Sequence, residues 1–305
     1  MARSHGFLRD LVVVAIYEFQ QAARTRLLQV GVLAYAGATM AAHAGFVEGL
    51  QEAERSVAIA MGVPATEKPG ALIGAALKST DLRRFLADLI GSEATLDRLT
   101  EAPVLALWSG AVAMVLLPIF VLVGTSTSLS AEVESRSIRF LALRTERLPI
   151  VLGKLGGQLL IATLAALSGV VVTEFAGLVL MVQQPPLALA AYALLHAGRG
   201  LVYALPFAAL GLAVSQWVPR ANPARLVTML ALLAVLVGHI WLDELTDATV
   251  AGRVADLVRI FLPGSGWNDL WSMDAGTFAL AAARNVVLTF AWVAVGYARF
   301  DRRDL

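Results

Sequence analysis

Cysteine is absent from this chain of 305 residues, and charged residues make up only 15% of it. Without cysteine, disulfides, thiolate catalysis and cysteine-ligated metal sites are excluded. The small charged fraction, with 58% hydrophobic residues and a mean hydropathy of +0.72, is too low for the surface of a soluble domain. The composition therefore predicts an integral membrane protein.

Motifs for catalysis are missing as well. The four histidines form no HExxH pair, and no GxSxG is present. A phosphate-binding loop would read GxxxxGK[ST], but Gly153 and Lys154 are followed by Leu155, and the upstream glycine is absent. We therefore expect no catalytic residue and no metal or cofactor bound by this chain. Any nucleotide that drives it must bind to another chain.

Long apolar runs are the feature that the chain does have. A bilayer core about 30 Å thick needs ~20 mostly apolar residues per helix, and six stretches qualify. They are roughly residues 27–47, 105–129, 155–181, 194–217, 224–242 and 277–298. The predicted fold class is an all-α polytopic membrane protein, with one transmembrane domain over residues 1–305.

The orientation follows from the basic residues, which are enriched on the cytoplasmic side of membrane proteins. If the N-terminus is inside, the inner segments hold 14 of the 24 basic residues but only 7 of the 23 acidic ones. Six spans then place both termini in the cytoplasm. We expect a multi-pass protein of the cytoplasmic (inner) membrane, surrounded by lipid and without a nucleic-acid partner.

Two segments outside the spans have helical patterns. Residues 6–26 repeat apolar residues at helical spacing, which predicts an amphipathic helix in the inner interface, or else a plain extension of the first span. The extracytoplasmic loop, residues 48–104, contains "STDLRRFLADLIG" and "SEATLDRL", which predict a small helical subdomain. Its apolar stripe is suited either to packing on the membrane domain or to docking an external protein.

An ionisable residue inside a span needs a partner or a function. Four such residues are considered as one layer: Glu174, Arg199, His239 and Arg284. Counted along their helices at ~1.5 Å per residue, Glu174 and Arg199 share a depth in the outer leaflet, which predicts an ion pair. This layer is either an outer polar gate that contacts a polar substrate or a structural tie between helix ends. In span three, small residues such as Gly153 and Gly157 predict close helix contact.

The segment between spans two and three, residues 130–154, is a charged hairpin at the cytoplasmic face. Its "SRSIRFLAL" predicts a short helix, with Ile138, Leu141 and Leu143 on an apolar side, and Pro149 predicts a turn before span three. The segment is suited either to docking another protein or to anchoring on lipid head groups. The acidic residues between its arginines favour docking, because anionic head groups repel them.

This segment resembles the element that joins the second and third spans in permeases of the ABC type-2 exporter family. There the sequence is approximately E-x-E-x-G-T-L, followed by a leucine run, an arginine and a closing L-G-K. Glu132 and Glu134 match the two acids, and Gly153 and Lys154 match the closing pair. Arg136 replaces the usual glycine, and Thr145 stands where proline is common.

The resemblance implies one half of an ATP-driven exporter, in which two permease subunits pair and each docks a cytoplasmic ATPase that holds the ATP and Mg²⁺. The 130–154 hairpin would be the coupling element. Its coupling residues would be Glu132, Glu134, Ser137, Arg139, Leu141, Arg144, Arg147 and Lys154. Two alternatives remain: an ion-coupled secondary transporter that uses Glu174, and a non-transporting scaffold that recruits a partner through its outer loop.

Overall fold

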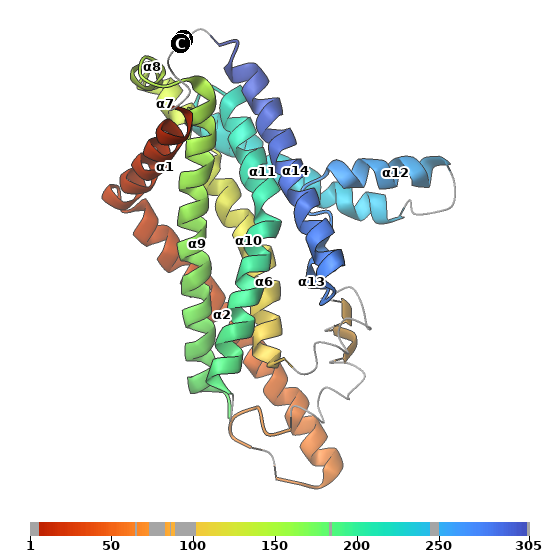
Figure 1. The fold of residues 1–305 in the computed structure, drawn as a ribbon. Coiled ribbons are helices and arrows are strands. Elements are labelled where there is room, and N and C mark those ends of the chain that lie inside the picture. Colours follow the sequence, from red (N-terminus) through yellow and green to blue (C-terminus); the bar gives the residue numbers. More distant parts are fainter. Residues whose placement is uncertain are drawn as a thin grey trace.

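The computed structural model describes residues 6–64, 66–72, 83–85, 87–88, 102–182, 185–244 and 250–303. Every regular element within these ranges is a helix, and the long helices form one elongated bundle (Figure 1). The predicted all-α polytopic fold is confirmed.

Six helices are long and apolar enough to cross a membrane, as predicted. They are α2 (Leu27–Met61), α6 (Val104–Thr125), α9 (Arg147–Leu180), α10 (Pro186–Trp217), α11 (Ala221–Glu244) and α14 (Ala275–Phe300). Helix α2 continues beyond residue 47 to Gly62, whose left-handed φ of 66° ends it. The beginning of the predicted 48–104 loop is therefore part of this helix.

Helix α10 lies at the centre of the bundle and packs against α6, α9 and α14. Its contact with α6 depends on glycine. A Cβ on Gly200 would lie 3.1 Å from the Ala113 Cβ, and one on Gly211 would lie 2.7 Å from the Leu122 carbonyl oxygen. Glycine at these positions lets the two backbones approach closely, a common solution where lipid supplies no hydrophobic force between helices.

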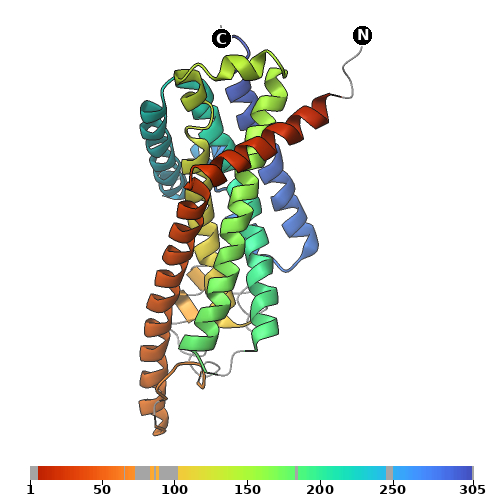
Figure 2. The ribbon, with the colours of Figure 1, turned by 90° about the vertical axis from the view of Figure 1, so that its left-hand side faces the viewer.

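The N-terminal helix α1 (Phe7–Arg24) lies across α9 near one end of the bundle (Figure 2). Its apolar Leu8, Val12 and Ile16 are exposed. Its place in the membrane interface stays a prediction. Its opposite face buries Val14 and Glu18 against the bundle. The amphipathic helix is therefore present, and its acidic Glu18 faces the protein.

The charged hairpin consists of α7 (Ser130–Glu134) and α8 (Ile138–Ala142). Arg136, with a left-handed φ of 59°, turns the chain between them. Pro149 forms no turn before span three. It lies in the first turn of α9, where a missing N–H breaks no helical bond. Residues 147–154 thus belong to α9, and "the hairpin" below means residues 130–146.

The hairpin, α1 and the C-terminal end of α14 lie at the same end of the molecule, which we call the hairpin end (Figure 1). At the opposite end, the Phe46 ring stacks on Trp108 with centroids 4.9 Å apart, and Phe85 lies 6.1 Å from the same indole. Ala87 is buried in the core. The rest of the two helices predicted around residues 79–99 lies outside the described residues.

Helices α11 and α12 (Val250–Phe261) project from the side of the bundle (Figure 1). A tight turn then leads into the short helix α13 (Trp267–Trp271) and on to α14. This turn contains Gly264 and Gly266, with left-handed φ values of 97° and 89°. Glycine adopts this conformation without the strain that other residues incur.

The α6–α10 contact can be tested with two alanine substitutions on one helix. We expect Gly211→Ala to lower stability by about 1–3 kcal/mol, because its Cβ meets the α6 backbone. Gly198→Ala is the matched control, since a Cβ there has nothing within 4 Å, and it should leave stability unchanged or slightly higher. Thermal unfolding in detergent measures both. Equal melting temperatures would contradict the proposed close contact.

Candidate functional site: a buried charge cluster beneath the hairpin

A lysine and two carboxylates meet below the hairpin. The Nζ of Lys154 lies 2.8 Å from Glu18 Oε2 and 2.8 Å from Glu132 Oε1. Gln158 Nε2 donates a hydrogen bond of 3.1 Å to the other oxygen of Glu18. Lys154 is only 2% exposed. These four residues, which we call the charge cluster, join α1, the hairpin and α9.

Local sequence explains why the helices meet here. Lys154 is flanked on α9 by Gly153 and Gly157, the small residues predicted to allow close contact. A Cβ on Gly153 would lie 2.6 Å from the Val14 Cβ, and one on Gly157 would lie 2.7 Å from the Glu18 Cβ. Only glycine at both positions lets α1 come near enough for Glu18 to reach Lys154. The predicted close packing of span three is thus a contact with α1.

The cluster contains one cation and two carboxylates, all largely removed from water. The second oxygen of Glu132, Oε2, is buried and has no hydrogen-bond partner among the described residues. A buried ion pair contributes little net stability, but the loss of one partner leaves an uncompensated charge at a cost of about 3–5 kcal/mol. The cluster therefore resists any movement that separates the hairpin from α1 or α9.

Further hydrogen bonds fix the hairpin to α10 and α11. The Ser215 hydroxyl accepts from the backbone N–H groups of Leu129 and Ser130, at 2.8 and 2.9 Å. Glu134 Oε2 accepts from the Ala221 N–H, 2.9 Å away, in the first turn of α11. A carboxylate at a helix N-terminus also interacts favourably with the helix dipole.

Arg147 secures the point where the hairpin enters α9. Its Nη1 donates to the carbonyl of Phe300 at 2.8 Å and to that of Asp301, at the C-terminal end of α14. Its guanidinium also lies 5.9 Å from the centre of the Phe300 ring. Of the predicted coupling residues, Glu132, Glu134, Arg147 and Lys154 therefore interact within the chain.

The opposite side of the hairpin is exposed. Phe140 and Leu143 are 74% and 84% exposed, and Arg136, Arg139 and Arg144 are exposed beside them. We call these five residues the exposed hairpin face. It combines large apolar side chains with a positive charge, a composition typical of protein interfaces. Of the other predicted coupling residues, Ser137 lies next to Ser135, with their hydroxyls 3.0 Å apart, and Leu141 is half-buried.

The predicted apolar side of the hairpin is partly wrong. Ile138 is buried and Leu141 packs against the core, but Leu143 points outward, and the sequence reasoning missed Phe140. The reason is length, because α8 has only five residues and ends at Ala142. A helical repeat carried past that residue assigns Leu143 to the wrong side.

The predicted ion pair between Glu174 and Arg199 is absent. Arg199 instead donates to the carbonyls of Trp271 and Ser272, both at 3.2 Å, and lies over the Phe278 ring. From its position on α10, Arg199 therefore contacts both the end of α13 and the first turns of α14. Glu174 is half-buried on α9 and has no hydrogen-bond or ion-pair partner among the described residues. Their helices direct the two side chains to different neighbours.

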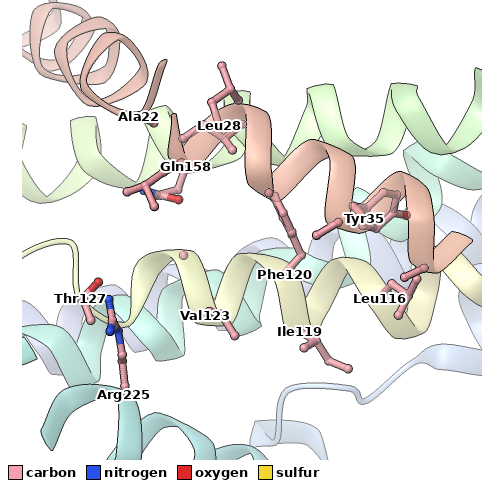
Figure 3. Close-up of a pocket in the computed structure, with 16 residues that line it drawn as sticks. Ala22, Leu28, Tyr35, Leu116, Ile119, Phe120, Val123, Thr127, Gln158 and Arg225 are labelled. Carbon is pink, nitrogen blue, oxygen red and sulfur yellow. The ribbon is translucent and has the colours of Figure 1, made fainter. Parts of the chain in front are cut away.

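An apolar cavity of about 490 Å³ lies beside the charge cluster, between α2, α6 and α9. Figure 3 shows Tyr35, Phe120 and Ile119 along it, and Thr127, Gln158 and Arg225 toward one end. Gln158 therefore belongs both to the cavity wall and to the charge cluster. The sequence contains no signal for this cavity, because its walls come from separate helices.

Six apolar helices with a braced hairpin between the second and third define a multi-pass membrane protein of the permease class. The chain belongs to the ABC-2 family: the model of the family described as "ABC-2 family transporter protein" matches residues 12–305. No curated protein matches the chain. The resemblance inferred from the hairpin sequence is confirmed. Membership of this family implies partnership with an ATPase subunit.

The stabilising role of the charge cluster can be tested by removing its cation. Lys154→Met keeps the side-chain length but leaves Glu18 and Glu132 facing each other, so we expect a loss of about 3–5 kcal/mol. Adding Glu18→Gln and Glu132→Gln should restore most of that stability, because the buried negative charge disappears. Unfolding in detergent is the measurement. A single variant as stable as the triple one would rule out charge pairing at this site.

Proposed function

We propose that this chain is the permease subunit of an ATP-driven exporter, and that the exposed hairpin face docks a cytoplasmic ATPase. One observation carries the proposal: the hairpin is held from within by bonds to α9, α10 and α11, while Arg139, Phe140 and Arg144 remain exposed. A short element held in this way transmits displacement instead of absorbing it. ATP and Mg²⁺ would bind to the ATPase, and this chain would have no catalytic residue.

The internal contacts of the hairpin support a mechanism for coupling. When the ATPase closes on nucleotide, it would displace the hairpin. Glu132 would carry this movement through Lys154 to α9 and α1, and Glu134 would carry it to the first turn of α11. The movement would thus reach three separate parts of the membrane domain. In this proposal the hairpin end faces the cytoplasm, and two permease chains pair.

The apolar cavity would offer an export cargo a binding site next to the charge cluster and the hairpin. Its lining suits an apolar molecule or the apolar part of one. Because Gln158 lines the cavity and bonds to Glu18, a molecule in the cavity would lie against a member of the charge cluster. Cargo occupancy and hairpin position would then influence each other.

Docking is tested by charge reversal on the exposed hairpin face. The chain is co-expressed with a soluble ATPase that carries a phosphate-binding loop and is encoded by a neighbouring gene, and the complex is purified through the permease. Arg139→Glu combined with Arg144→Glu should reduce the ATPase recovered by roughly tenfold or more, because both charges lie in the proposed interface.

Arg302→Glu is the matched control, since this arginine is exposed at the same end but lies outside the hairpin. It should leave recovery unchanged. Phe140→Ala should weaken binding without any change of charge, because buried aromatic residues are frequent hot spots of interfaces. If the ATPase is fully retained by both the double reversal and Phe140→Ala, while the chains remain folded, the hairpin is not the docking site.

A further inference from the structure

A second cavity, of about 620 Å³, lies among α10, α11, α12, α13 and α14, and it shares no residue with the charge cluster. Its lining includes Arg259, Arg284, His239, Asp269, Tyr203 and Trp267. Two of the four ionisable residues noted inside the spans, His239 and Arg284, thus lie in one cavity. We call it the arginine cavity.

The lining of the arginine cavity contains the guanidinium groups of Arg259 and Arg284 and the carboxylate of Asp269. Arg284 Nη2 lies 3.5 Å from Asp269 Oδ2, but the Asp269 side chain is 51% exposed, so this pair is long and solvated. The Nε and Nη2 atoms of Arg284 are buried and donate no hydrogen bond to any described residue. Buried donors without acceptors are costly, which indicates a site for an anion.

The wall beside Arg284 is preformed. His239 Nε2 donates to the Pro263 carbonyl at 2.9 Å, and the Tyr203 hydroxyl donates to that of Gly264 at 3.3 Å. These bonds hold the tight turn between α12 and α13. The guanidinium of Arg284 lies against Gly266, where a Cβ would come within 2.9 Å of its Cζ and collide with its terminal nitrogen. The missing side chain of Gly266 is what makes room for the arginine.

The depth and surroundings of the arginine cavity restrict the ligand further. Arg284 lies well inside α14, a helix apolar enough to span the membrane, and an arginine at such a position indicates function. Leu236 and Ile260 also line the cavity. The neighbouring faces of α11 and α12 expose large apolar side chains, such as Ile240 and Leu257. A ligand with an anionic head and apolar chains satisfies both surfaces at once.

We infer that the arginine cavity binds the phosphate head group of an anionic phospholipid, with its acyl chains along α11 and α12. The phosphate oxygens accept hydrogen bonds from the Nε and Nη2 atoms of Arg284, in the two-pronged geometry that guanidinium groups favour. Asp269 opposes the ligand, because it competes for Arg284 and repels the phosphate. This site does not depend on the export proposal, since it involves neither the hairpin nor an ATPase.

The test counts lipids retained by the purified chain. The chain is released from nanodiscs containing equal amounts of phosphatidylglycerol and phosphatidylcholine, and native mass spectrometry records the bound lipid. We expect one phosphatidylglycerol per chain to resist removal, and Arg284→Gln to weaken its retention roughly tenfold. Asp269→Asn should increase retention. A purely structural role for the Arg284–Asp269 pair would make both variants lose lipid.

Two controls complete the experiment. Arg253→Gln removes an exposed arginine of α12 that does not line the cavity, and it should leave retention unchanged. Arg284→Lys keeps the charge and should retain lipid at an intermediate level, and melting temperatures establish that each variant is folded. The proposal is overturned if folded Arg284→Gln keeps its phosphatidylglycerol or if phosphatidylcholine is retained equally well. It is also overturned if millimolar inorganic phosphate displaces the lipid, because the site would then bind free anions.

Discussion

The interaction on which the rest of this structure depends is the contact of Lys154 with Glu18 and Glu132. The three side chains come from α9, α1 and the hairpin, and the lysine is almost completely removed from water. Separating Lys154 from its carboxylates would leave charges buried and unpaired, which is far more costly than breaking an exposed ion pair. The cluster therefore ties the N-terminal helix, the hairpin and the third span together at this end of the bundle.

These contacts explain why the hairpin carries charged residues both on the side that faces the bundle and on the side that faces away from it. Its inward residues Glu132 and Glu134 hold it against the bundle, and Arg147, where the hairpin enters α9, bonds to the end of α14. Its outward residues make no such contacts and are available to another protein. Arginine has two different surroundings deeper in the bundle as well. Arg199 donates from both terminal nitrogens to backbone carbonyls at the end of α13 and leaves only its Nε without a partner, whereas Arg284 lines a cavity and has no hydrogen-bond acceptor for its Nε and Nη2 among the described residues.

Much of the fold was predictable because hydropathy is a local property. The six spans, the amphipathic helix before them and the hairpin between the second and third each follow from neighbouring residues. The errors have a common physical origin. Depth along a helix, counted from its end, placed Glu174 and Arg199 at one level, but the rotation of each helix about its axis decides which neighbour a side chain meets. The partnership of Lys154 with Glu18, 136 positions earlier, had no signal in the sequence beyond two flanking glycines.

The sequence by itself determined that this is a helical membrane protein of the ABC-2 type, with a charged hairpin between two spans and no nucleotide-binding loop of its own. Only the tertiary structure decided which charges brace that hairpin, which face of it is exposed, and that His239, Arg259 and Arg284 line one cavity. The reason is that length and polarity are read along the chain one segment at a time. Contacts between helices depend instead on their crossing and rotation, which small residues such as Gly153 and Gly266 permit but do not specify.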